Sequence, residues 1–227
     1  MKTVFKINFV NNHLLIQDGD ATILVDTGSP ITIHVDQELQ FAGETYQVTT
    51  NALGNTIEKL KSLSKLEFTT LMGLDILSKY KVIIDYKNSE ISFFTKDELN
   101  PNGDICTFKM MMGAIIIPIE INGKTCDMIL DTGATLSYID ISMTKGLISR
   151  ETITDFSPLV GGQFSTPVFE IESSFNGVPF NCRYGNLPST IALMMKMIGV
   201  WGVIGYDFLN SFKIMIDISD SKMIFIR

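Results

Sequence analysis

Apolar and polar residues alternate in short runs along most of this chain, which predicts a protein built mainly from β-strands. Asp-Gly at 18–19 and Asn-Gly at 122–123 and 176–177 are strong signals for hairpin turns between such runs. Strands are expected at residues 4–9, 14–16, 21–25, 31–34, 39–41, 45–48, 81–85, 91–94, 106–111, 114–121 and 126–130. Helical spacing is confined to short segments, at residues 57–66, 74–80 and 191–198.

The same pattern occurs twice. An apolar strand runs into Asp-Thr-Gly at residues 26–28 and again at residues 131–133, each time after a hairpin. Further along, residues 71–95 and 203–227 are identical at 8 of 25 aligned positions, including a glycine after two apolar residues. An internal duplication explains both observations.

The duplication predicts two domains of unequal length. We expect an N-terminal lobe at residues 1–98, a linker at 99–104, where turn-forming residues are dense, and a C-terminal lobe at 105–227. The C-terminal lobe has an insertion with two strand-like arms at residues 154–171. A glycine pair between such arms predicts a mobile hairpin tip, formed by Val160, Gly161, Gly162 and Gln163.

Composition excludes several classes of function. The net charge of −7 and pI near 4.8 argue against binding to nucleic acid or to an anionic membrane surface. No apolar run reaches the roughly 18 residues of a membrane span, and none near the N-terminus has the length of a signal peptide. The three cysteines lack metal-type spacing, so we expect buried thiols, no metal and a cytoplasmic location.

Two aspartates that end apolar strands could serve peptide-bond chemistry. When two carboxyl groups share one proton, the ionised group can activate water and the protonated group can supply an acid. Glycine allows a tight backbone beside each carboxylate, and threonine hydroxyls can bond where two turns meet. The plain alternative is that each aspartate merely caps a turn, which two matched copies make less attractive.

Two other pairs of aspartates that match between the repeats have simpler explanations. Asp85 and Asp217 each precede a turn and are expected to accept hydrogen bonds from it. Asp75 and Asp207 each begin a short helix, where a negative charge is favourable. With only two histidines and no Gly-x-Ser-x-Gly or His-Glu-x-x-His motif, serine-histidine and zinc hydrolase schemes lack parts.

The paired Asp-Thr-Gly turns, each followed by an apolar-apolar-Gly and a short helix, resemble the aspartic peptidases of the pepsin and retropepsin superfamily. The resemblance covers essentially the whole chain. The chain is similar to two retropepsin-like units fused in tandem. It implies a mostly β, bilobal acid-protease fold with two pseudo-symmetric barrel-like lobes. It also implies a catalytic dyad of Asp26 and Asp131 in a peptide cleft, supported by the turn residues Thr27, Gly28, Ser29, Thr132, Gly133 and Ala134.

The two turns differ by one residue, because Ser29 follows Gly28 whereas Ala134 follows Gly133. In the family that this chain resembles, a hydroxyl there donates to the outer carboxylate oxygen, which implies that Asp26 ionises more readily than Asp131. Peptidases of this family resemble the chain in having a flap, a hairpin that covers the substrate. Here the flap is expected in the C-terminal lobe, at the hairpin tip of residues 160–163. The expected function is an aspartic endopeptidase acting on peptides or proteins as a monomer without a cofactor; the alternative is a catalytically silent peptide-binding module.

Overall fold

The computed structural model describes residues 2–95, 101–157 and 162–226, and it confirms a mostly β fold. Helical elements are short. The described residues contain α1 (Ile57–Ser64), α2 (Leu74–Leu77), α3 (Ser189–Met197), α4 (Tyr206–Ser211) and the 3₁₀ turn η1 (Ile141–Met143). We refer to residues 2–95 as the N-terminal half and to residues 101–226 as the C-terminal half.

A five-stranded sheet in the order β2-β3-β4-β8-β5 forms the body of the N-terminal half. Its strands are β2 (Asn8–Val10), β3 (His13–Asp18), β4 (Ala21–Val25), β5 (Ile33–His34) and β8 (Thr70–Met72). The central strand β4 pairs with β3 on one side and runs parallel to β8 on the other. The last three residues of β4, Ile23, Leu24 and Val25, are all buried. Asp26 is the first residue after the strand.

A short hairpin, β6 (Glu38–Phe41) and β7 (Glu44–Gln47), forms a separate two-stranded sheet in the N-terminal half. Leu39 and Phe41 are buried, and the Phe41 ring packs against Phe5 and Phe93. The Asp18 carboxylate accepts a hydrogen bond from the backbone N–H of Ala42 at the hairpin tip (2.7 Å). This hairpin is therefore fixed against the core of its own half.

The C-terminal half repeats the plan with longer strands. Its eight-stranded sheet has the order β12-β13-β14-β19-β15-β18-β17-β16, with β14 again parallel to β19. The strands are β12 (Lys109–Met111), β13 (Ala114–Ile121), β14 (Lys124–Leu130), β15 (Ser137–Ile139), β16 (Glu151–Ser157), β17 (Gly162–Phe175), β18 (Val178–Asn186) and β19 (Gly202–Ile204). Asp131 follows β14 as Asp26 follows β4.

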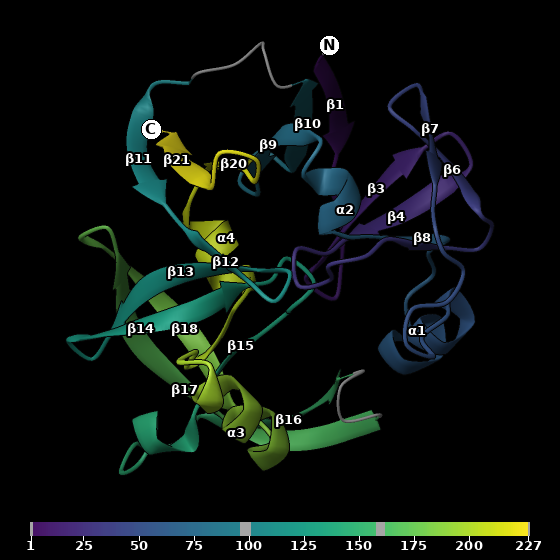
Figure 1. Ribbon diagram of the computed structural model, residues 1–227. Coiled ribbons are helices and arrows are strands. Elements are labelled where there is room, and N and C mark those ends of the chain that lie inside the picture. Colours follow the sequence, from purple (N-terminus) through teal and green to yellow (C-terminus); the bar gives the residue numbers. More distant parts are fainter. Residues whose placement is uncertain (1, 96–100, 158–161, 227) are drawn as a thin grey trace.

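Strands from both halves combine in a six-stranded sheet of order β1-β10-β9-β20-β21-β11, which lies at the top of Figure 1. Its strands are β1 (Lys2–Lys6), β9 (Tyr80–Asp85), β10 (Glu90–Thr95), β11 (Gly103–Thr107), β20 (Ile214–Asp217) and β21 (Lys222–Ile226). The halves meet where β9 pairs antiparallel with β20. Two ion pairs cross this junction: Lys213 with Asp85 (2.8 Å) and Lys81 with Asp217 (3.9 Å).

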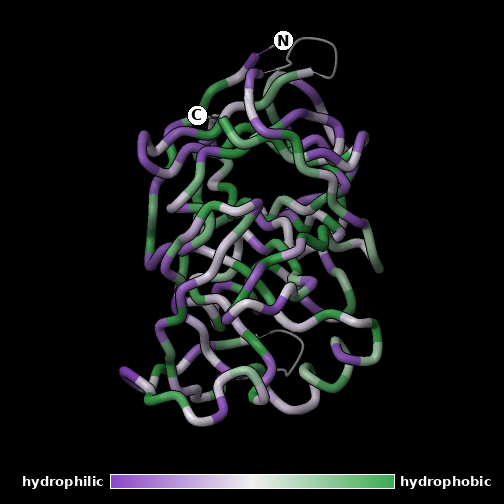
Figure 2. The backbone as a smooth tube through the Cα atoms, turned by 90° about the vertical axis from the view of Figure 1, so that its left-hand side faces the viewer, coloured by the Kyte–Doolittle hydropathy of each residue, from purple (hydrophilic) through white to green (hydrophobic). Residues whose placement is uncertain are grey.

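The main hydrophobic core extends through both halves. Ile23 and Val25 of β4, Met128 and Leu130 of β14, and the central sheet residue Ile84 all belong to one cluster of buried residues. Hydrophobic and hydrophilic stretches alternate along the tube in Figure 2, as sheets with one buried face require. The strand ends that carry the two aspartates are therefore anchored in one continuous core.

Several expected strands are interrupted for a physical reason. The strands expected at 4–9 and 106–111 each split at a buried apolar residue, Ile7 and Phe108. The N–H groups of Ile7 and Phe108 donate to Ser89 and Ser221, so the chain changes from one sheet to the other there. The strand expected at 31–34 shrinks to β5. Residues 99 and 100 of the expected linker lie outside the described residues, and Gly103 already begins β11.

Candidate active site

Equivalent backbone contacts hold the two Asp-Thr-Gly turns. The N–H of Asp26 donates to the carbonyl of Met72 at the end of β8 (2.9 Å), and the N–H of Asp131 donates to the carbonyl of Ile204 at the end of β19 (3.0 Å). The parallel neighbour strand thus fixes the point at which each aspartate leaves the sheet. The structure brings the two turns, 105 residues apart in sequence, into direct contact.

Thr27 and Thr132 lock the two turns together. The hydroxyl of Thr27 donates to the carbonyl of Leu130 (2.8 Å), and that of Thr132 donates to the carbonyl of Val25 (2.7 Å). Each hydroxyl also accepts the backbone N–H of the other threonine, at 2.9 and 3.0 Å. Because Thr27 and Thr132 are only 2% and 1% exposed, these four bonds satisfy polar groups that water cannot reach.

Gly28 and Gly133 lie against the carboxyl group of the opposite half. A Cβ atom on Gly28 would lie 2.5 Å from Cγ of Asp131, and one on Gly133 would lie 2.9 Å from Cγ of Asp26. Both distances are too short for a non-bonded contact. Glycine is therefore required here by the proximity of the two carboxyl groups.

The second pair of matched glycines lies behind the turns. A Cβ atom on Gly73 would lie 2.8 Å from the carbonyl oxygen of Ser29, and one on Gly205 would lie 2.4 Å from that of Ala134. The next residues, Leu74 and Tyr206, donate their N–H groups to these same carbonyls. The start of a short helix thus braces each turn from behind, as the matched spacing in the sequence suggested.

Asp26 and Asp131 are half-buried, their carboxyl groups each lie against the glycine of the opposite turn, and the two groups hydrogen-bond each other. Burial and the negative charge of Asp131 raise the pKa of Asp26 well above its usual value. Burial also raises the pKa of Asp131, but the hydrogen bond from Asp26, the N–H groups of Gly133 and Ala134 and the charge of His13 oppose this effect. The pKa values of both carboxyl groups are thus raised, as expected for a pair that shares one proton.

This arrangement contradicts the expected role of Ser29. Its hydroxyl donates to the carbonyl of Ile31 (2.8 Å) within its own turn, and so it does not bond the carboxylate of Asp26. Ala134 contributes more than its side chain suggests, because its N–H donates to Oδ1 of Asp131 (3.1 Å) beside that of Gly133 (2.8 Å). On the other side, the N–H of Gly28 donates to the Asp26 carboxyl (2.8 Å), and the N–H of Ser29 also acts on that carboxyl. That Asp26 ionises before Asp131 stays a prediction, without the hydroxyl donor on which it was based.

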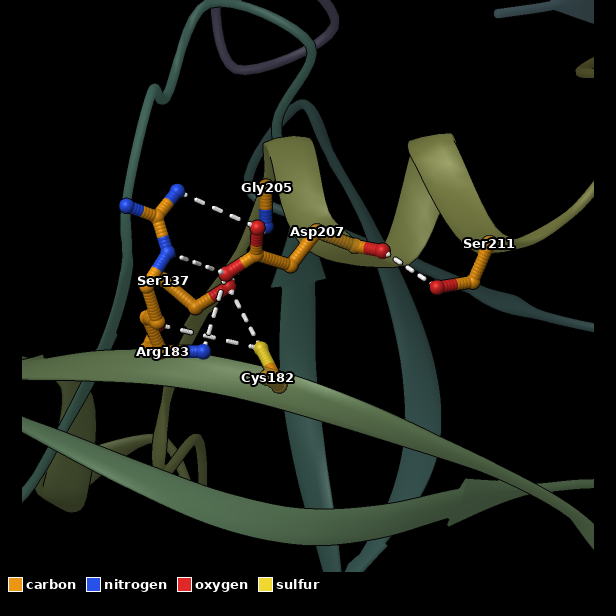
Figure 3. A network of polar contacts seen from close by, with 6 residues as sticks. All are labelled: Ser137, Cys182, Arg183, Gly205, Asp207 and Ser211. Carbon is orange, nitrogen blue, oxygen red and sulfur yellow. Dashed lines mark hydrogen bonds and ion pairs between the residues drawn. The ribbon is translucent and has the colours of Figure 1, made fainter. Parts of the chain in front are cut away.

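The acidic residues that begin α2 and α4 have different partners in the two halves. Asp75 accepts hydrogen bonds from the N–H and the hydroxyl of Thr32, three residues beyond Ser29. Asp207 instead forms a two-pronged ion pair with Arg183 of β18, with both N···O distances at 3.2 Å, and also accepts the N–H of Arg183 (2.8 Å). Figure 3 shows the guanidinium facing this carboxylate, above Ser137 and Cys182. These aspartates do more than favour a helix terminus.

Asp85 and Asp217 accept hydrogen bonds from the turns that follow them, as expected. The N–H of Asn88 donates to Asp85 and the N–H of Asp220 donates to Asp217. The ion pairs of these two carboxylates across the β9–β20 junction were not foreseen, because the pairing of these strands is not visible in the sequence.

A cavity of about 260 Å³ adjoins the second turn and lies between the halves. Asn11 and Asn12, in the turn between β2 and β3, line it from the N-terminal half. From the C-terminal half it is lined by Thr135, Leu136, Glu151, Ile153, Val168 and Arg183. The sequence alone did not single out these residues as part of a site. The only local signal was the polar pair Asn11 and Asn12, whose positive φ angles form a tight turn.

The expected flap corresponds to the hairpin of β16 and β17, on the edge of the eight-stranded sheet. Gly162 and Gln163 begin β17 and pair with Ser157 and Phe156. Val160 and Gly161 lie outside the described residues. The arms of this hairpin carry two cavity-lining residues, Ile153 and Val168, so its base borders the site.

The residues that the structure describes contain no group of three or more histidine, cysteine, aspartate or glutamate side chains arranged to hold a metal. Cys106, Cys126 and Cys182 are free thiols. Within the described ranges no helix has the length and apolar character needed to cross a membrane.

One comparison with known proteins concerns the C-terminal half. Residues 117–208, which include Asp131, match a family model described as aspartyl protease. The match confirms the resemblance to aspartic peptidases that the sequence predicts. Among solved structures, the chain is similar to the solution structure of the simian foamy virus (mac) protease, with 13% identity, 40% of this chain and 86% of that chain covered, and a TM-score of 0.30. A search of curated proteins gives no match.

Proposed function

We propose that this protein is an aspartic endopeptidase that hydrolyses peptide bonds between Asp26 and Asp131. The observation that carries the proposal is the close approach of two half-buried carboxyl groups, held by reciprocal threonine bonds from opposite halves. A structural role alone does not account for two carboxyl groups held together in this way. Removing such a pair from water costs free energy, and its close approach is possible only because Gly28 and Gly133 lack side chains.

In the proposed mechanism, Asp131 is the ionised carboxyl group and Asp26 the protonated one. The Asp131 carboxylate takes a proton from a water molecule, whose oxygen attacks the carbonyl carbon of the peptide bond. Asp26, which holds the other proton, donates it to the carbonyl oxygen as negative charge develops there. The proton on Asp131 then passes to the peptide nitrogen as the C–N bond breaks, and Asp26 regains its proton from the hydroxyl of the intermediate.

The substrate in this proposal is an extended peptide that lies between the dyad and the hairpin of β16 and β17. Val160, Gly161, Gly162 and Gln163 are proposed to form the flap tip over it. Because both aspartates come from one chain, a monomer suffices, and two lobes related by pseudo-symmetry replace the two subunits of a dimer. The chemistry assigned to the dyad requires only water and the two carboxyl groups.

The test is cleavage of a mixed peptide library between pH 3 and 8. Wild type should cleave a subset of peptides, and pepstatin should inhibit the cleavage. Asp26→Asn and Asp131→Asn should each lower the rate by about 10²–10⁴-fold or more, because each removes one half of the acid–base pair. Asp220→Asn, on an exposed turn, is the matched control and should leave the rate unchanged.

The alternative is a peptide-binding module with the same fold and no turnover. Under it, wild type would bind library peptides or pepstatin without cleaving any of them at any pH. Both Asp-Thr-Gly turns are complete and are held by matching threonine hydrogen bonds. This favours the enzyme, because a binding module has no need for two carboxyl groups that share a proton.

A further inference from the structure

His13 begins β3, the strand next to the one that ends just before Asp26. In the ladder of β3 and β4, Leu15 lies opposite Leu24 and Ile16 opposite Ile23. Continuing this register places His13 opposite Asp26. The side chain is buried, with the residue only 7% exposed, and Nδ1 lies 3.3 Å from the carbonyl oxygen of Val10. A titratable ring thus lies in the wall of the site, outside the mechanism proposed above.

The equivalent position in the C-terminal half has no such group. In the ladder of β13 and β14, Ile116 lies opposite Ile129, and the same continuation places Ala114 opposite Asp131. His13 is therefore one of the features that make the two halves unequal at the dyad itself.

The groups that face His13 come from both halves. The adjoining turn residues Asn11 and Asn12 line the same cavity as Thr135, four residues after Asp131, and Ile153, two residues before Asp155 on the same face of β16. The charges of Asp155 and Asp131 both act on the His13 ring. Asp155 also accepts a hydrogen bond from the hydroxyl of Tyr138 on β15, which fixes its carboxylate. Across its own sheet, the continued register places Asp26 opposite His13.

We propose that His13 is a positioning residue that couples the β16 arm of the C-terminal hairpin to the dyad. Its protonated ring attracts the carboxylate of Asp155 and favours the negative charge on Asp131. The effect of His13 on catalysis rests on the proposed function, whereas its charge coupling to Asp155 does not.

The direction of the pH effect follows from burial and charge. Burial lowers the pKa of His13 below 6.5, against the opposing contributions of the Val10 carbonyl and of the Asp155 and Asp131 charges. The ring is therefore neutral at neutral pH and gains its charge only in acid. That charge lowers the pKa of Asp131, so the singly ionised dyad persists to lower pH.

The first test is an NMR titration of wild type, which has only two histidines, so that both rings can be followed separately. His34, bonded to Thr69 and Thr70 within the N-terminal half, is the internal control. Asp155→Asn should lower the pKa of His13 by about half a unit or more and leave the ring resonances of His34 in place. Asp220→Asn should not change the pKa of His13. An unchanged His13 pKa in Asp155→Asn would overturn the proposal even if the protein cleaves no peptide.

The second test uses the pH dependence of kcat/KM for a cleavable peptide. His13→Gln should move the acid limb of the profile to higher pH, because the cation that favours ionised Asp131 is gone, and His34→Gln should leave that limb in place. Asp155→Asn provides the same comparison if His13→Gln does not fold. An equal decrease at all pH values in both His13→Gln and Asp155→Asn would show a merely structural role and contradict the proposal.

Discussion

In the N-terminal half, the hairpin that follows the Asp-Thr-Gly turn has two strands of four residues each, β6 and β7, and packs into its own core. In the C-terminal half, β16 and β17 have 7 and 14 residues and lie at the edge of the larger sheet, next to the cavity. The turns themselves are held by matching hydrogen bonds at nearly equal distances. The support of the two aspartates is thus the same in both halves, whereas within the described residues the long edge hairpin occurs in only one of them.

The largest effect expected from breaking the shared support is at the glycines. Gly28→Ala and Gly133→Ala place a methyl group against the opposite carboxyl group, so the two carboxyl groups must separate. A displacement of about 1 Å can cost about 10²-fold in rate, and we expect at least that loss of kcat/KM in both variants. Asp220→Asn, on an exposed turn outside the site, is again the control. Peptide cleavage at near wild-type rate by Gly28→Ala would contradict the close approach of the carboxyl groups.

The threonine bonds give the next largest effect. Thr27→Val and Thr132→Val each remove a donor and an acceptor and leave a buried carbonyl and a buried N–H unpaired. Each unpaired group costs roughly 1–3 kcal/mol, so both variants should lose about 2–5 kcal/mol of unfolding free energy in urea titrations. Thr27→Ser and Thr132→Ser keep the hydroxyl and should lose much less. Strongly unequal losses for the two valine variants would break the proposed symmetry of the turns.

Asp26→Asn should stabilise the protein at neutral pH while abolishing cleavage. A carboxyl group whose pKa is raised by folding contributes stability below its unfolded pKa of about 3.8, and this contribution is lost as pH rises through the folded value. At pH 7 the wild type therefore bears a cost that asparagine removes. Thermal unfolding should show a higher Tm for Asp26→Asn than for wild type at pH 7, and a smaller difference at pH 3. A lower Tm at pH 7 would contradict the shared proton.

The smallest effect is expected at the junction of the halves. Burial raises the pKa of Asp85, but its bonds to Lys213 and Asn88 outweigh this and lower the pKa overall. A lowered pKa adds stability above about pH 3.8 that is lost as pH falls through the folded value. Lys213→Met should therefore cost about 1 kcal/mol at pH 7 and less at pH 3, measured in urea. Lys81→Met, whose ion pair spans 3.9 Å, should cost less at pH 7.

Much of this architecture is readable from the sequence because the duplication repeats strong local signals. The Asp-Thr-Gly turns, the glycines behind them and most strands follow from apolar periodicity and turn chemistry within each half. The contacts across halves do not: Asn11, Arg183 and His13 reach the site only through the packing of one sheet on another. The partner of the Ser29 hydroxyl was also hidden, because this hydroxyl bonds the carbonyl of Ile31 in its own turn rather than the carboxylate of Asp26.

The most direct test of the central claim, that Asp26 and Asp131 work as one unit with a single shared proton, is the pH dependence of kcat/KM on a cleavable peptide. We predict a bell-shaped profile for wild type, with activity lost when the pair gains a second proton and when it loses the last one. Asp26→Asn and Asp131→Asn should be inactive across the whole range. Cleavage by either variant at the wild-type rate, or a wild-type rate that stays flat from pH 3 to 8, would contradict the account.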